Sequence, residues 1–103
     1  MGAAGYPALV DWFAAAMLKK LNANRPKGGW DATPNGALFA RLKEETAELS
    51  AAVSAGKSVA EVLGEAADVA NFALFIADNY AAANTEGSAA SPAAGARPEH
   101  DAV

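Results

Sequence analysis

The chain has 103 residues and a formal net charge of -4, with no cysteine and a single histidine, His100. That length suits one domain and lies near the lower limit at which a chain buries a self-sufficient core. The absence of cysteine excludes disulfides, thiolate zinc sites and a cysteine nucleophile, and one histidine excludes a histidine metal cluster. No run of Lys or Arg is long enough to track a phosphate backbone, which argues against a nucleic-acid polymer as a partner.

The composition favours helices over a sheet. Hydrophobic residues make up 52% of the chain and are dominated by Ala, Leu and Val, while aromatic residues are sparse. The N-terminus lacks a basic segment followed by a continuous apolar core, and Asp68, Asn71 and Asp78 interrupt the most apolar later stretch. We therefore expect an all-α, soluble, cytoplasmic protein that does not bind a membrane.

A first helix is predicted from about Leu9 to Asn24. Its apolar residues recur at steps of three and four, as on one face of a helix. These residues are Val10, Phe13, Ala14, Met17, Leu18 and Leu21. Pro26 and the following Lys27-Gly28-Gly29 predict the end of the helix, because proline lacks a backbone donor and paired glycines favour a turn.

A second helix is predicted to begin at Thr33-Pro34, with Thr33 as the N-cap and Pro34 in the first helical position. It should run to about Ala55, where Gly56-Lys57 follows and ends it. Because this connection is short, the second and third helices are predicted to be antiparallel neighbours.

The third helix is predicted to start at Ser58-Val59-Ala60-Glu61, which has the pattern of a capping box, and to continue to about Ala83. It is apolar nearly all round and needs more than two partner helices. We expect a small bundle of three to four helices, completed by oligomerisation. Residues 84–103 contain Ala, Gly, Ser and Pro without an aromatic residue, which predicts a flexible tail outside a helical domain at residues 1–83.

Acidic residues fall on the apolar faces of the second and third predicted helices. At about 100° per residue, Glu45 lies about 20° from the centre of the stripe that contains Leu38. Glu44 and Glu48 lie on the flank of that stripe. On the third helix, two further acids fall between aromatic or aliphatic residues: Glu65 between Phe72 and Ile76, and Asp68 between Phe72 and Phe75.

A divalent metal would account for this placement. A carboxylate in an apolar setting is costly unless it is neutralised, paired or bound to a metal. The cations expected nearby, Arg41, Lys43 and Lys27, are too few to pair all of the acids. Mg²⁺ takes oxygen ligands, keeps several waters and suits substrate phosphates, with Mn²⁺ as a substitute. Glu45 and Glu48 are one helical turn apart, and so are Glu65 and Asp68. Each pair can therefore chelate a metal ion from one face of its helix.

The alternative for each motif is structural. Acids in a helix usually form a solvated face, and a purely structural bundle would be stabilised by Glu45→Leu. A second alternative is a non-catalytic helical module whose acids bind a metal or a basic partner protein. The coincidence of both acidic sets on apolar stripes of adjacent helices favours the metal site.

The acidic motifs resemble those of a known family. Glu44-Glu45-Thr46-Ala47-Glu48, followed after sixteen residues by Glu65-Ala66-Ala67-Asp68, is similar to the E-E-x-x-E…E-x-x-D signature of all-α nucleotide pyrophosphohydrolases. The MazG-like branch also resembles this chain at residues 27–31, which read Lys-Gly-Gly-Trp-Asp, and at residues 67–72, which read Ala-Asp-Val-Ala-Asn-Phe. The resemblance spans about Phe13 to Asn79.

This resemblance implies an enzyme that converts a (deoxy)nucleoside triphosphate into a monophosphate and pyrophosphate with Mg²⁺, as a homodimer or homotetramer. Residues 1–83 would be the catalytic domain. The implied metal ligands are Glu45, Glu48, Glu65 and Asp68. The implied catalytic acids are Glu44, Glu45 and Glu48. Among them, Glu44 would be a further metal ligand or the group that positions or deprotonates the attacking water.

Three further residues are candidates for substrate binding. Lys27 could contact a phosphate, or be a solvated loop lysine. Trp30 could stack on a base, although a loop tryptophan more often anchors its loop by packing. Asn71, one turn after Asp68, could bind the base, the sugar or a water, or make a hydrogen bond between helices. Asp78 and Asn79 could belong to the far rim of the site, but solvation at the helix end is the favoured interpretation.

Overall fold

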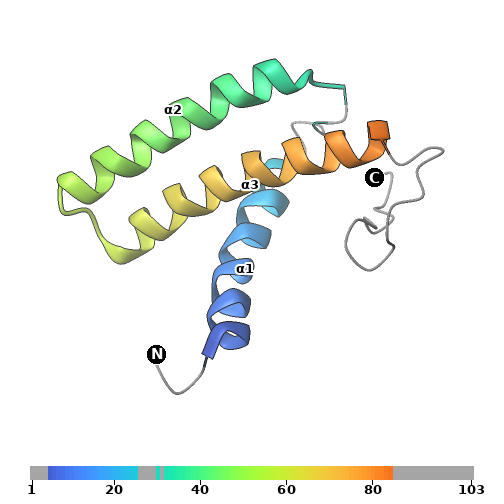
Figure 1. Ribbon diagram of the computed structural model, residues 1–103. Coiled ribbons are helices and arrows are strands. Elements are labelled where there is room, and N and C mark those ends of the chain that lie inside the picture. Colours follow the sequence, from blue (N-terminus) through green and yellow to red (C-terminus); the bar gives the residue numbers. More distant parts are fainter. Residues whose placement is uncertain (1–4, 26–29, 31, 85–103) are drawn as a thin grey trace.

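The protein is all-α, as predicted. The computed structural model describes residues 5–25, 30 and 32–84, and Figure 1 shows them as three helices, with no strand in these ranges. The helices are α1 (Gly5–Asn24), α2 (Asn35–Ser54) and α3 (Val59–Asn84). In Figure 1, α2 and α3 run side by side and α1 crosses α3, so α3 is the central helix that packs against both others. Of the predicted tail, Asn84 is the last residue of α3, and the rest lies outside the described residues.

The start of α2 differs from the prediction by one residue. The N-cap is Pro34, in an extended conformation with φ -61° and ψ 147°, and no side chain caps this end. Thr33 is not the cap, because its backbone N–H donates to the Trp30 carbonyl at 2.9 Å and closes a turn before the helix. Proline's fixed φ suits this extended position as well as the first helical turn, so the sequence alone could not place the boundary.

The connection between α2 and α3 combines a glycine cap with a capping box. Gly56 has φ +67° and its N–H bonds the Val53 carbonyl at 3.1 Å, while the Lys57 N–H bonds the Ala52 carbonyl at 3.0 Å. These two bonds form the Schellman motif that ends many helices. At the start of α3, the Glu61 N–H donates to the Ser58 hydroxyl at 3.1 Å. The predicted capping box is therefore confirmed, and the tight turn makes α2 and α3 antiparallel neighbours.

The turn before α2 is anchored to the C-terminal half of α3. The Asn79 amide nitrogen lies 3.3 Å from the carbonyl oxygens of Trp30 and Thr33 and 3.4 Å from the Asn35 side-chain oxygen. The Trp30 indole N–H donates to Asp78 at 3.0 Å. The expectation that Asp78 and Asn79 are solvated was wrong, because α3 continues past them and both side chains hold the turn in place.

The hydrophobic core of one chain is small. The buried hydrophobic residues in the described ranges are Leu38, Ala52 and Ala67, and α1 has no buried residue. Val53 of α2 is 59% exposed. Three helices thus leave much apolar surface uncovered. Among the described residues, no helix is both long enough and apolar enough to cross a membrane.

The capping box predicts a measurable loss of stability in Ser58→Ala. This change removes the hydroxyl that accepts from the Glu61 N–H, and we expect a loss of about 1 kcal/mol in the free energy of unfolding. Urea unfolding followed by circular dichroism measures it. Ser50→Ala, at an exposed position inside α2, is the control and should change stability by less than about 0.5 kcal/mol. Equal stability of both variants would contradict the capping role.

Candidate metal centre

Three carboxylates from two helices converge between α2 and α3. Glu45 comes from α2, and Glu65 and Asp68 lie one turn apart on α3. One carboxylate oxygen of each residue lies within 4.8 Å of those of the other two. Glu45 is only 5% exposed, and Glu65 and Asp68 are half-buried. The prediction that Glu45 points toward the core is therefore confirmed.

Two of these carboxylates have an oxygen without a partner. Glu45 Oε1 and Glu65 Oε1 are buried and accept no hydrogen bond from the described residues. Burial raises the pKa of Glu45, and the neighbouring charges of Glu48 and Asp68 raise it further, while Arg41 opposes the shift. Like charges held together at low solvent exposure are unfavourable, so the cluster has an unmet need for positive charge.

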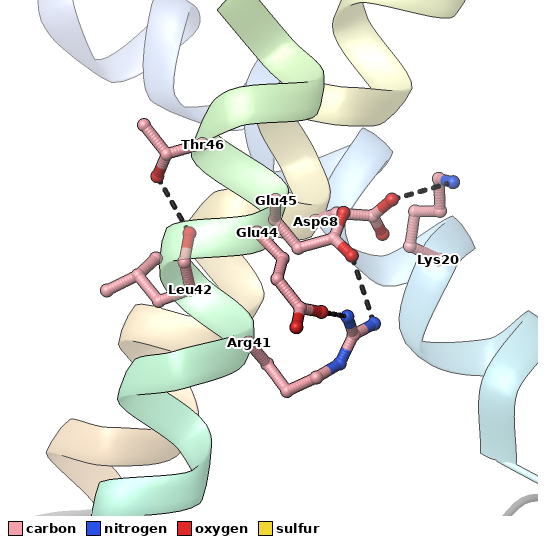
Figure 2. Close-up of polar contacts among 7 residues, drawn as sticks. All are labelled: Lys20, Arg41, Leu42, Glu44, Glu45, Thr46 and Asp68. Carbon is pink, nitrogen blue, oxygen red and sulfur yellow. Dashed lines mark hydrogen bonds and ion pairs between the residues drawn. The ribbon is translucent and has the colours of Figure 1, made fainter.

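Two cationic side chains meet part of this need. Figure 2 shows Arg41 reaching both Glu44 and Glu45, and Lys20 approaching Asp68 from α1. The Arg41–Glu45 ion pair measures 3.0 Å and the Lys20–Asp68 pair 3.1 Å. The Arg41 guanidinium also lies over the Phe72 ring, 5.2 Å from its centroid. Glu65 has no ion pair within the described part of the chain.

Lys20 was missed at the sequence level. The cations expected near the acids were Arg41, Lys43 and Lys27, of which Arg41 alone is found paired with them in the described ranges. The sequence did offer one signal of a buried role for Lys20: this lysine lies one turn after Met17, on the predicted apolar face of the first helix. Its partner could not be found, because local sequence does not fix how α1 packs along α3.

Glu44 and Glu48 lie at the edge of the cluster. Both are exposed, and Glu44 accepts from Arg41. Glu48 is not among the three residues whose oxygen atoms converge, although its charge acts on Glu45. Their roles as catalytic acid and metal ligand stay predictions.

A cleft of about 480 Å³ opens beside the cluster. One part of its wall carries charged side chains and another carries aromatic rings. Its lining consists of Lys20, Leu21, Asn24, Trp30, Thr33, Leu38, Arg41, Glu45, Asp68, Asn71, Phe72 and Phe75. The Trp30 and Phe75 rings are stacked with centroids 4.4 Å apart, and Phe75 meets Phe72 edge to face. The cleft therefore offers both a charged end and an aromatic wall to one ligand.

The candidates for substrate binding have different positions. Trp30 is half-buried, packs on Phe75 and lines the cleft, so it both anchors its turn and borders the site. Asn71 makes the alternative bond between helices, since its amide nitrogen donates to the Met17 carbonyl at 3.1 Å. Its buried Oδ1 has no partner among the described residues, and Asn71 also lines the cleft. Lys27 lies outside the described residues.

The cluster fits a hard divalent cation. Its donors are all carboxylate oxygens, the ligand type that Mg²⁺ and Mn²⁺ prefer. Two buried oxygens, on Glu45 and Glu65, receive from the described residues none of the hydrogen bonds that buried polar atoms normally make. A bound cation would satisfy both and relieve the repulsion among the three acids.

An all-α bundle with a converging acidic cluster is the arrangement expected of an all-α nucleotide pyrophosphohydrolase. Residues 11–80 match the family model of phosphoribosyl-ATP pyrophosphohydrolase, and the chain belongs to this family. The resemblance to all-α nucleotide pyrophosphohydrolases is thus confirmed. Membership supports hydrolysis of a pyrophosphate bond in a nucleotide. Neither the curated proteins nor the solved structures searched gave a match.

The burial of Glu45 predicts how stability depends on pH without metal. A carboxyl whose pKa is raised in the folded state binds protons more readily there, so its contribution to stability falls as pH rises from its unfolded pKa through its folded pKa. Glu45→Gln removes this loss. In the presence of a chelator, we expect the variant to melt at a higher temperature than the parent at neutral pH, with the difference shrinking in mild acid.

Thermal unfolding by circular dichroism across this pH range measures the effect. Two exposed acids are available for a control, Glu61 on α3 and Asp11 on α1. Asp11→Asn is the better control, because Glu61→Gln would alter the capping box. A Glu45→Gln protein less stable than the parent at neutral pH would mean that the ion pair with Arg41 outweighs the desolvation of Glu45.

Proposed function

We propose that the protein is a Mg²⁺-dependent nucleoside triphosphate pyrophosphohydrolase, which converts a (deoxy)nucleoside triphosphate into a monophosphate and pyrophosphate. Mn²⁺ would substitute for Mg²⁺. The observation that carries the proposal is the convergence of Glu45, Glu65 and Asp68 within 4.8 Å, with two buried oxygens unpartnered in the described chain. Family membership supports the pyrophosphate bond as the point of cleavage.

The proposed metal ligands are Glu45, Glu48, Glu65 and Asp68. Glu48 lies one turn after Glu45, so a rotation of its exposed side chain could bring its carboxylate from the edge of the cluster to the bound cation. When bound, the cation neutralises the acids, polarises phosphate oxygens and shields the charge of the departing pyrophosphate. Without it, the three converging carboxylates would repel a polyanionic substrate.

The reaction joins a water oxygen to the α-phosphorus, and the bond from this phosphorus to the bridging oxygen breaks. Pyrophosphate leaves with that oxygen and with the electron pair of the broken bond. Glu44 is proposed to position the water or accept its proton, because its exposed carboxylate is held beside the cluster by Arg41.

The aromatic wall is proposed to bind the nucleoside. Trp30 is fixed by Phe75 on one side and by its hydrogen bond to Asp78, so it presents a rigid surface to a base. The buried Asn71 Oδ1 has no partner among the described residues, and Asn71 lines the cleft, so this oxygen is proposed to accept from an amine or hydroxyl of the nucleoside. Lys27 is proposed as a phosphate contact from the sequence alone.

The name of the family indicates a second substrate. Phosphoribosyl-ATP also carries a triphosphate, and its hydrolysis by the same bond cleavage releases pyrophosphate. The acidic cluster would act on both substrates in the same way, so the difference lies in the part of the cleft that holds the base and sugar. A screen of the common nucleoside triphosphates and phosphoribosyl-ATP, assayed for pyrophosphate against phosphate, separates these candidates.

The chain is also proposed to form a homodimer or homotetramer. Helix α1 has no buried residue, and its large apolar side chains Val10, Trp12 and Leu18 are 60%, 54% and 57% exposed. Exposed apolar side chains of this size are typical of an interface, and a second copy is the partner that would supply the missing helices for the small core.

Replacing a cluster acid predicts loss of turnover without loss of helicity. We expect pyrophosphate release to depend on Mg²⁺ and to fall by roughly a hundredfold or more in Glu65→Gln, Asp68→Asn and Glu48→Gln, because each removes a proposed ligand charge. Asp11→Asn, an exposed acid on α1, is the matched control and should keep full activity. The assay is pyrophosphate release, with far-UV circular dichroism to check helicity.

The pattern among variants also tests individual roles. Full activity in Glu65→Gln would contradict the proposed centre, whereas full activity in Glu48→Gln alone would remove Glu48 from it. Magnesium binding without turnover on any nucleotide in the screen would favour the non-catalytic helical module.

Self-association predicts that Trp12→Glu produces smaller particles. A charge at this exposed position cannot be buried at an interface without a large desolvation cost, while it leaves the interior of one chain unchanged. Light scattering after size exclusion should show an oligomer for the parent and the Asn22→Glu control, and a smaller species for Trp12→Glu. A monomeric parent would contradict the proposal.

A further inference from the structure

The Lys20–Asp68 ion pair occupies the acidic cluster from the α1 side. Lys20 Nζ lies 3.1 Å from Asp68 Oδ2, and Figure 2 shows the lysine reaching Asp68 on the side away from Arg41. The Lys20 side chain is 39% exposed and Asp68 is 21% exposed. Lys20 also lines the cleft. Its ammonium therefore contacts solvent, the cleft and a proposed metal ligand at the same time.

The stem of Lys20 passes close to a glycine of α3. Gly64, one turn before Asp68, is inside α3, where glycine costs about 1 kcal/mol relative to alanine. A Cβ at this position would meet Lys20 Cε at 3.3 Å, closer than ordinary contact. The missing side chain leaves room for the lysine stem to lie against α3 and reach Asp68.

A divalent cation and Lys20 compete for the same carboxylate. Lys20 and a cation held by the three converging oxygens would both need the Asp68 carboxylate, and two positive charges at one carboxylate repel each other. Arg41 offsets Glu44 as well as Glu45, and Glu48 adds a further negative charge beside them, so the cluster still attracts a divalent cation. Lys20 would then lose its ion pair to the stronger charge, and an anionic phosphate in the cleft is the partner that would receive its ammonium.

Lys20 is the cation that can move. Arg41 is held by Glu44, by Glu45 and by its position over the Phe72 ring. The Lys20 ammonium donates to Asp68 alone within the described part of the chain. Lysine also has a flexible stem and three donors on a compact charge, which suits exchange between oxygen partners.

We propose that Lys20 is a built-in competitor for the metal, which holds Asp68 when no metal is present and contacts the substrate's phosphates once a divalent cation takes Asp68. This inference rests on the proposed function, since it assigns Lys20 a part in metal binding and substrate binding at the same site. The proposal also orders the two binding steps. The metal binds first and releases Lys20, and the Lys20 ammonium is then available to the phosphate.

Lys20→Met tests the proposal through two readouts that change in opposite directions. Methionine keeps much of the apolar stem and removes the charge. Calorimetric titration with Mg²⁺ alone should show a dissociation constant about fivefold lower than in the parent, because the competing ion pair is gone. The KM for the nucleotide should rise by about tenfold, because a phosphate contact is lost.

Lys19→Met is the matched control. Lys19 is the exposed neighbour on α1 and makes no ion pair with the described acids, so this variant carries the same change in net charge. Lys20→Gln repeats the test if the methionine variant loses helicity. A purely structural role for Lys20 would not make magnesium bind more tightly while the nucleotide binds more weakly.

The outcomes are separable from those of the proposed function. A magnesium dissociation constant in Lys20→Met equal to that in Lys19→Met would overturn the proposal, and so would an unchanged KM. Absence of turnover in the unchanged protein would refute the proposed function, and the magnesium titration would still decide whether Lys20 competes with the metal.

Discussion

The burial of the Glu45 carboxylate against two other acids is the constraint on which the site depends. Glu45 is 5% exposed, and its oxygen lies within 4.8 Å of oxygens from Glu65 and Asp68. A buried carboxylate among like charges is destabilising unless cations offset it. Arg41 and Lys20 offset part of the charge, and two buried oxygens keep no partner in the described ranges. The fold thus holds an arrangement that costs stability, as functional sites often do.

Helix geometry made this arrangement predictable in part. The position of Glu45 follows from the 3.6-residue period alone, because the same face carries Leu38, and the capping box at Ser58 follows from spacing within one turn. These are local features. Lys20 and Asn79 could not be assigned, since their partners lie 48 and up to 49 residues away and depend on how helices pack. The N-cap of α2 was predicted one residue too early, at Thr33. The sequence did not reveal that the Thr33 N–H donates to the Trp30 carbonyl and closes a turn before the helix.

The small core connects the fold with the proposed assembly. The described chain buries Leu38, Ala52 and Ala67, all on α2 and α3, while α1 contributes half-buried and exposed side chains. Yet α1 supplies Lys20 to the acidic cluster and the Met17 carbonyl to Asn71. A helix that is weakly packed in one chain therefore carries contacts of the site, so contacts made by α1 in an oligomer would also influence the position of Lys20.

The central claim is that the cluster binds a divalent metal ion, and crystals grown with Mn²⁺ test it most directly through the anomalous scattering of manganese. We expect an anomalous peak at coordination distance from carboxylate oxygens of Glu45, Glu65 and Asp68, with Lys20 displaced from Asp68. The same map would show whether Glu48 joins them. An ordered cluster without a peak, in which Lys20 and Arg41 stay paired with the acids, would contradict the account.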